Sequence, residues 1–212
     1  MKKSAIIVAG GKGLRMGSKI PKQFIEIDSK PIIARTIERF LEFDPEIQLV
    51  VVIPIDQEET WNDIREYYFA KVEIYVAHGG ATRFDSVVNG LDYVDEGLVA
   101  IHDAVRPYVS GETIQESFDA AEQSGSGVAA VELKDSIREI TDNLSRARDR
   151  RNFRLIQTPQ TFQVDKIKEA YKKAEGKDFL DDASVYESAG NKVNLISGTY
   201  DNIKITTPDD LK

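Results

Sequence analysis

The sequence predicts an α/β fold: a doubly wound, mainly parallel mixed sheet that is covered by helices on both faces and carries a projecting β-hairpin arm. Apolar, β-branched runs of strand length recur along the chain, and amphipathic stretches of helical length lie between most of them. This alternation is typical of parallel sheets, whose crossover connections place helices on the faces. In such open sheets a ligand binds at the carboxyl ends of the strands. The predicted strands cover residues 4–9, 48–53, 72–76, 98–102 and 127–133.

Two of the intervening segments have clear helical periodicity. Residues 31–43 place Ile, Phe and Leu side chains at helical spacing, and residues 82–94 do the same with Phe, Val and Leu. Near the end of the chain, Pro208 followed by two acidic residues predicts the first turn of a further helix. Each helix is expected to bury one apolar face against the sheet.

The alternation breaks at residues 134–153, which predict the arm. Polar and apolar residues alternate on both sides of a turn at 141–143, and the segment is too polar to form a core. Because a two-stranded hairpin is only marginally stable alone, we expect it to pack on a second copy of the chain. A surface excursion without any partner is the alternative.

Composition restricts the possible functions. The 212 residues carry a net charge of −8, which argues against a general nucleic-acid surface because such a surface must be basic. Cysteine is absent, which excludes disulfides and thiolate metal sites. The apolar run near the N-terminus is too short for a signal peptide, and no run approaches membrane-spanning length. We therefore expect one cytoplasmic domain over 1–212 that binds neither nucleic acid nor membrane.

A glycine cluster follows the first predicted strand directly. Its backbone N–H groups can approach an anion closely, and several cations come next. The spacing does not fit a Walker A loop, and it does not fit the dinucleotide fingerprint, because Met16 stands where the last glycine should be. The pattern predicts a site for a nucleoside triphosphate. Its residues are Ala9, Gly10, Gly11, Gly13, Arg15, Lys19 and Lys22.

A second candidate site follows the predicted strand at 98–102. Asp103 stands at the carboxyl end of this buried strand, and a single carboxylate there is suited to hold Mg²⁺ against phosphate oxygens. We expect His102 to be a packed, hydrogen-bonded spacer rather than a base. Arg106 either pairs with a nearby carboxylate or contacts the ligand.

Two weaker signals lie elsewhere in the chain. Gly80 and Ser86, near the start of the predicted helix at 82–94, can hydrogen-bond the edge of a flat base, and Arg83 offers a planar cation. Lys204 lies in a predicted polar turn and short strand within 201–206, where alternation alone places it on the surface.

A series of motifs, in order and across almost the whole chain, resembles one enzyme family. The motifs read A-G-G-x-G-x-R-M-G, P-K-Q-F, G-G-A-x-R-x-x-S-V, H-D-A-V-R-P, K-D-S-I, D-R, T-P-Q-T-F, D-D-A-S and D-N-I-K-I-T. They resemble those of the 2-C-methyl-D-erythritol 4-phosphate cytidylyltransferases, which have a Rossmann-like fold of the nucleotide-diphospho-sugar transferase type. These enzymes belong to the non-mevalonate route to isoprenoids.

The resemblance implies a reaction and a set of residue roles. CTP and a sugar-alcohol phosphate would form a CDP-alcohol and pyrophosphate, with Mg²⁺ as cofactor, in a homodimer whose arms are swapped between subunits. Since both reactants are anionic, a site rich in Arg and Lys without a general base suits this reaction. The implied catalytic residues are Arg15, Lys22, Arg150 and Lys204. The implied nucleotide contacts are Ala9, Gly10, Gly11, Gly13, Gly80, Arg83, Ser86 and Asp103, which also holds the metal. The implied acceptor contacts are Ser136, Arg150, Thr158 and Asp201.

Three other functions share part of this pattern. Ribitol-5-phosphate cytidylyltransferases share most of these motifs, including the Ala-Gly-Gly form of the loop. The tripeptide His102-Asp103-Ala104, the motif D-D-A-S and the pair Asp135-Ser136 nevertheless resemble the first family more closely. A hexose-1-phosphate nucleotidyltransferase would share the opening loop but not the arm or T-P-Q-T-F. A nucleotide-binding module without catalysis would have lost cations or carboxylates that this chain retains. Because Arg151 and Arg154 lie beside Arg150, the arginine that meets the acceptor phosphate stays open.

Overall fold

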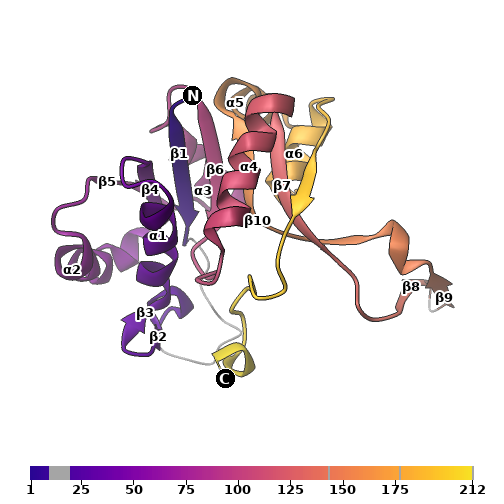
Figure 1. The fold of residues 1–212 in the computed structure, drawn as a ribbon, viewed down its shortest axis with the longest axis horizontal. Coiled ribbons are helices and arrows are strands. Elements are labelled where there is room, and N and C mark those ends of the chain that lie inside the picture. The colour runs from indigo at the N-terminus through magenta and orange to yellow at the C-terminus, as the bar shows by residue number, and fades with distance from the viewer. Residues whose placement is uncertain (10–19, 143, 177, 212) are drawn as a thin grey trace.

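In the described part of the chain, seven strands form the central sheet in the order β11-β7-β10-β6-β1-β4-β5 (Figure 1). The structure is a computed structural model that describes residues 1–9, 20–142, 144–176 and 178–211. Neighbouring strands are parallel except at β10, which is antiparallel to both β6 and β7. The strands are β1 (Lys3–Val8), β4 (Gln48–Ile53), β5 (Ile74–His78), β6 (Leu98–Asp103), β7 (Ser126–Glu132), β10 (Arg154–Gln163) and β11 (Leu195–Ser197). The predicted mainly parallel α/β sheet is confirmed.

Helices cover both faces of this sheet, as doubly wound topology requires. In β1, Ile7 packs under α1, α2 and α4, whereas its neighbour Ile6 packs under α3, α5 and α6. Because successive strand residues point to opposite faces, the apolar runs supply both cores at once. The helices are α1 (Ile32–Phe43), α2 (Glu58–Phe69), α3 (Arg83–Leu91), α4 (Gly111–Ser124), α5 (Val164–Lys173) and α6 (Asp182–Ser188). The helices predicted at 31–43 and 82–94 are therefore confirmed as α1 and α3.

Short elements connect these layers. A two-stranded ribbon, β2 (Glu26–Ile27) and β3 (Lys30–Pro31), precedes α1. Single 3-10 turns lie at η2 (Lys22–Phe24), η3 (Ile55–Gln57), η4 (Arg150–Asn152) and η5 (Pro208–Leu211). The last of these confirms a helical turn at the C-terminal proline.

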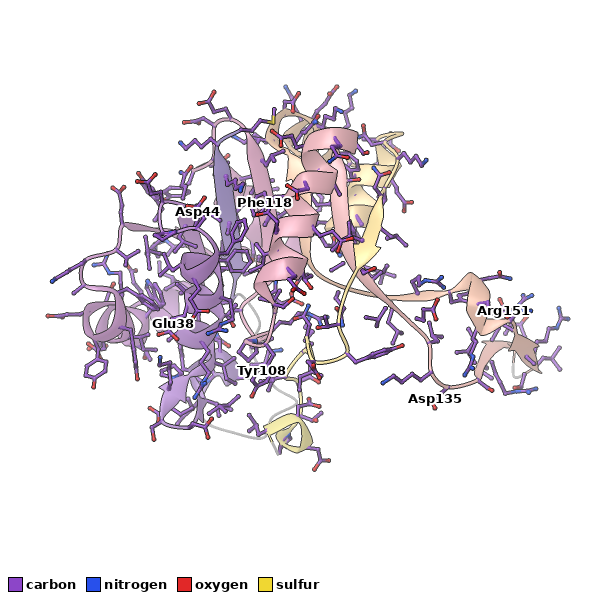
Figure 2. The ribbon with its side chains drawn as sticks, in the orientation of Figure 1. Glu38, Asp44, Tyr108, Phe118, Asp135 and Arg151 are labelled. Carbon is purple, nitrogen blue, oxygen red and sulfur yellow. The ribbon has the colours of Figure 1, made fainter. Side chains whose placement is uncertain are left out.

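The projecting arm is confirmed as a hairpin of β8 (Ile137–Thr141) and β9 (Leu144–Arg148). Figure 1 shows it extending away from the sheet, and Figure 2 shows Asp135 and Arg151 on it, away from the body of the protein. Its side chains Ile140 and Leu144 are 67% and 60% exposed. Such apolar exposure on a marginal hairpin is what a packing partner would cover.

One predicted element is wrong. Residues 203–206 form no strand but an irregular segment, which is held to the body by a hydrogen bond from the Ile205 N–H to the Val105 carbonyl at 2.9 Å. Since Ile205 is fully buried, its apolar side chain packs in a small cluster with Ile32 rather than in a sheet. The alternation of apolar and polar side chains at Ile203, Lys204 and Ile205 therefore results from the packing of Ile205 against the body of the protein and not from a β-strand.

Candidate functional site

A cavity of about 330 Å³ opens at the carboxyl ends of β1 and β6. The strand register pairs Val8 with Asp103, so Ala9, the residue after β1, lies at the same edge of the sheet as that carboxylate. This is the edge at which open α/β sheets bind their ligands. The cavity is lined by Val8, Ala9, Lys22, Gln23, Gly80, Ala81, Thr82, Arg83, Ser86, Asp103, Val105 and Lys204.

The structure brings together many of the residues singled out from the sequence, but not all. Ala9, Lys22, Gly80, Arg83, Ser86, Asp103 and Lys204 all line this cavity. Gly10, Gly11, Gly13 and Arg15 lie outside the described residues. Thr158 is buried, Asp201 is exposed outside the lining, and Ser136 and Arg150 belong to the arm.

Two hydrogen bonds hold the backbone of Ala9, which forms one wall of the cavity. The Ala9 N–H donates to the Val52 carbonyl at 2.8 Å, and the buried Gln23 amide donates to the Ala9 carbonyl at 3.0 Å. Lys22 precedes Gln23 in the same 3-10 turn, so the anchoring of Gln23 also places Lys22 at the cavity. Backbone and cation are thus fixed relative to each other.

The opposite wall is the loop that enters α3. Thr82 caps α3 in a reciprocal capping box with Asp85. Gly80 lies so close to this turn that a Cβ there would stand 2.2 Å from the Cβ of Asp85, which only glycine avoids. The Gly80 N–H donates to Ser86 Oγ at 3.0 Å, and Ser86 donates onward to the Thr82 carbonyl at 2.9 Å. The two groups expected to read a base therefore also order each other.

Asp103 is surrounded by cations from three segments. Its Oδ2 lies 3.0 Å from Lys204 Nζ and 3.3 Å from Arg106 Nε, and its Oδ1 lies 4.0 Å from Arg83 Nε. Burial alone would raise the pKa of Asp103, but Lys204, Arg83 and Arg106 together hold that pKa well below its usual range. The carboxylate is thus ionised at neutral pH.

Lys204 reaches Asp103 because a network fixes the chain around it. Arg106 Nη1 donates to the Asn202 carbonyl at 2.7 Å, and the buried Asn202 amide donates to the Thr158 carbonyl at 2.8 Å. Thr158 in turn accepts the Asp103 N–H on its Oγ1 at 3.1 Å. Arg106 is 9% exposed, so the geometry supports the prediction that it pairs with a nearby carboxylate rather than with the ligand. Thr158 therefore supports Asp103 through the backbone.

His102 behaves as the predicted spacer. It is fully buried, its Nε2 lies 3.2 Å from the Arg106 carbonyl, and its ring meets Phe40 edge-on at 5.1 Å between centroids. Burial lowers the pKa of His102 to about 4, so the ring is neutral at pH 7. It does not face the cavity as a base.

One of the described lining residues of this cavity is suited to bind a magnesium ion. Among the described lining residues Asp103 is the single carboxylate, and the described chain contains no cluster of three or more His, Asp or Glu side chains able to hold a metal. Mg²⁺ in proteins takes one or two carboxylates and completes its shell with water and substrate phosphates. Asp103 supplies the carboxylate of this ligand set, so it would hold Mg²⁺ in the cavity only when a phosphate is bound as well.

The arm carries three arginines that differ in their contacts. Arg151 forms two-pronged contacts with Asp149, and Arg154 lies 3.4 Å from Glu132. Arg150 donates to the Lys134 carbonyl. The pKa of the neighbouring Asp149 is lowered by Arg151 and also by the charge of Arg150. Among the described residues, Arg150 is therefore the one of the three guanidinium groups that forms no hydrogen bond or close ion pair with a carboxylate.

Sequence reasoning missed the residues that support the site. Gln23 and Asn202 bond backbone carbonyls, and the buried Asp182 bonds Arg83 from behind the wall. Gln23 and Asp182 fall within the motifs P-K-Q-F and D-D-A-S, which gave them no role. Only the folded chain shows which distant group each one meets.

None of the described helices is long and apolar enough to span a membrane.

Comparison with known proteins gives a consistent family. The family model described as 2-C-methyl-D-erythritol 4-phosphate cytidylyltransferase matches residues 4–212. Proteins of that name from Phocaeicola vulgatus and Bacteroides thetaiotaomicron are each 46% identical over 213 residues, covering 100% of this chain and 97% of theirs. The solved 4-diphosphocytidyl-2C-methyl-D-erythritol synthase from Anaerococcus prevotii matches with a TM-score of 0.86 at 32% identity, covering 99% of this chain and 92% of that one.

Proposed function

The chain belongs to the 2-C-methyl-D-erythritol 4-phosphate cytidylyltransferase family, and from this we propose that it transfers the cytidylyl group of CTP to 2-C-methyl-D-erythritol 4-phosphate. The products are 4-diphosphocytidyl-2-C-methyl-D-erythritol and pyrophosphate, in the non-mevalonate route to isoprenoids. One observation carries the proposal: the full-length family match coincides with a cavity that is lined by Lys22, Arg83, Lys204 and one ionised carboxylate.

The reaction needs charge stabilisation rather than a base. An oxygen of the acceptor phosphate attacks the α-phosphorus of CTP, a new P–O bond forms, and the bond to the β-phosphate oxygen breaks as pyrophosphate leaves. The attacking oxygen is already anionic, so no proton has to be removed. Lys22 and Lys204, with Arg15 from the glycine loop, would stabilise the negative charge that grows on the transferred group.

The nucleotide would lie across the two walls of the cavity. We assign the phosphates to the backbone of Ala9 and of Gly10, Gly11 and Gly13, and the cytosine to the side of Gly80, Arg83 and Ser86. The fixed Ala9 backbone supports the first assignment, and the ordered Gly80 to Ser86 turn supports the second. Preorganised donors of this kind lose little entropy when the ligand binds.

Magnesium would be held by Asp103 and the triphosphate together. When bound, the ion supplies further positive charge against the phosphate oxygens. Lys204 Nζ contacts Asp103 Oδ2 in the structure, so the carboxylate that would anchor the ion also orients Lys204, a proposed catalytic cation. Asp201, exposed next to Asn202, would contribute at the edge of the acceptor subsite.

The acceptor phosphate would be bound by the arm of a second subunit. Ser136 and Arg150 lie on the arm, which Figure 1 shows extending away from the body of its own chain. We choose Arg150 over Arg151 and Arg154 because those two already contact carboxylates. Thr158 supports this wall through its bond to Asp103. The working unit is then a homodimer of 212-residue cytidylyltransferase domains, placed in the cytoplasm because CTP is a cytoplasmic nucleotide.

A side-by-side assay tests the function. Pyrophosphate release from CTP is measured with 2-C-methyl-D-erythritol 4-phosphate and with ribitol 5-phosphate under identical conditions. We expect the methylerythritol phosphate to be the strongly preferred acceptor. Preference for ribitol phosphate would reassign the acceptor, and no release with either would refute the proposed reaction.

A further inference from the structure

A buried carboxylate lies behind the cavity wall and has no part in the reaction described above. Asp182 is fully buried in the first turn of α6. Its Oδ1 accepts hydrogen bonds from Arg83 Nη1 at 2.8 Å and from the Tyr171 hydroxyl at 2.6 Å, and its Oδ2 accepts one from Arg83 Nη2 at 2.6 Å. Three charge-assisted bonds from α3 and α5 thus converge on one side chain.

The position of Asp182 is itself fixed from the sheet. Gln160 of β10 accepts the Ala183 N–H on its Oε1 at 2.8 Å and donates from its Nε2 to Asp181 Oδ2 at 3.1 Å. Asp181 caps α6 through a capping box with Ser184. The first turn of α6 is therefore tied to the central sheet on both sides of Asp182.

The consequence falls on Arg83, which lines the cavity. Burial would lower the pKa of Arg83, but Asp182 raises it far above its usual value, so the guanidinium stays charged. Both Nη groups bind Asp182, which fixes the guanidinium plane, and Nε lies 4.0 Å from Asp103 Oδ1. Without Asp182, the guanidinium would be an unbalanced cation within reach of Asp103.

We propose that Asp182, itself held by Tyr171, is a positioning residue for the nucleotide site: it fixes Arg83 in the cavity wall and limits the contact of Arg83 with Asp103 to the approach of Nε at 4.0 Å. Asp103 is then kept for Lys204 and for the incoming nucleotide with its metal. This inference rests on the proposed function, since it assumes that CTP occupies the cavity. It assigns a task to the first helical turn of D-D-A-S, which the reaction itself does not use.

Three variants test it: Asp182→Asn, Tyr171→Phe and the control Tyr186→Phe. The control also removes a buried tyrosine hydroxyl from the same apolar cluster, but that hydroxyl donates to the Gly125 carbonyl at 3.2 Å instead of to Asp182. CTP binding is measured by calorimetry, KM and kcat by pyrophosphate release, and folding by the melting temperature. We expect the CTP Kd and KM to rise about tenfold in Asp182→Asn and about threefold in Tyr171→Phe, since a misplaced cation weakens a preorganised site. The control should bind CTP like the wild type.

Each outcome decides the matter. Equal CTP affinity in Tyr171→Phe and Tyr186→Phe would overturn the positioning role, because the two variants would then differ in nothing that reaches the cavity. If Asp182→Asn fails to fold, as loss of a buried pair allows, the two tyrosine variants still give the answer. A wild type that binds CTP without turnover would refute the proposed reaction but leave the calorimetric comparison valid. A wild type that binds no CTP would overturn both.

Discussion

Asp103 joins three cations that the sequence keeps far apart. Arg83 begins α3, Arg106 follows β6, and Lys204 belongs to the irregular C-terminal segment. One carboxylate cannot balance three cations, and Asp182 balances only Arg83, so the cavity keeps an excess of positive charge. That excess suits a triphosphate with its metal.

The first prediction concerns the charge on Asp103. Asp103→Asn keeps the side-chain shape but removes the anion that would anchor Mg²⁺, so turnover should fall at least about tenfold and recover in part as Mg²⁺ is raised. Turnover is measured over a magnesium titration, with Asp95→Asn, an exposed carboxylate distant from the lining, as the control. A magnesium dependence identical to that of the wild type would argue against the metal assignment.

The second prediction concerns stability against pH. His102 has a pKa of about 4 when folded and about 6.5 when unfolded, so between these values only the unfolded chain takes up the proton. The free energy of unfolding should therefore be greatest above pH 6.5 and fall by up to about 1.4 kcal/mol per pH unit toward pH 4. His102→Gln should flatten that slope in urea titrations compared with the wild type. A slope equal to that of the wild type would contradict this account.

Residue roles were predictable from the sequence to different degrees. His102 was predictable as a spacer because a strand position fixes burial, and burial decides the behaviour of a histidine. Lys204 was not predictable from pattern alone, because its partner Asp103 lies in another segment and alternation reports only neighbours along the chain. The family resemblance, not periodicity, singled it out.

Among the elements, β10 differs most from what the pattern predicts. It is antiparallel in an otherwise parallel sheet and buries polar residues, including Gln160 and Thr161. Strand prediction fails there because Pro159 and the polar side chains resemble a loop. The fold satisfies those side chains instead, as in the bond from Thr161 Oγ1 to Ser117 Oγ at 2.8 Å. The strands β1, β4, β5, β6 and β7 were predictable because each is an apolar, β-branched run, whereas the short parallel strand β11 was missed, since only its central residue Ile196 is buried.

The third prediction concerns the contact between β7 and α4. Gly127 lies in β7, and a Cβ there would stand 2.2 Å from the Ser117 carbonyl of α4, which is backbone and cannot rotate away. Gly127→Ala should therefore lower the free energy of unfolding by about 3 kcal/mol, because the helix must move off the sheet. The control is Gly111→Ala at the first position of α4, where nothing lies within 4 Å, and it should be neutral. Urea unfolding of both variants compares them, and equal stability would exclude close packing as the reason for Gly127.

At the scale of the whole molecule, the arm projects from the body and contacts it at its base, where Lys134 Nζ lies 3.5 Å from the centre of the Tyr200 ring. Within the described residues its two strands pair only with each other, and Ile140 and Leu144 are more than half exposed. The sequence predicts such an arm from its polarity and its turn, but periodicity within one chain carries no information about a surface that would cover it. The cavity meanwhile takes no lining residue from the arm among those described.

The last prediction is that two chains share each active site. If Arg150 reaches the acceptor phosphate in the neighbouring subunit, chains carrying Lys22→Ala and chains carrying Arg150→Ala should each be inactive alone but regain activity when mixed. In a mixed dimer one site contains both defects, whereas the other combines an intact Lys22 with an intact Arg150 from the partner. Random pairing of equal amounts makes half the dimers mixed, each with one working site of two, so about a quarter of wild-type turnover should return. A mixture of Lys22→Ala with a double variant, Lys22→Ala plus Arg150→Ala, is the control, since no pairing of those chains builds an intact site. If turnover stays absent although sedimentation shows that mixed dimers formed, each chain uses its own Arg150, and the arm must fold back over its own cavity.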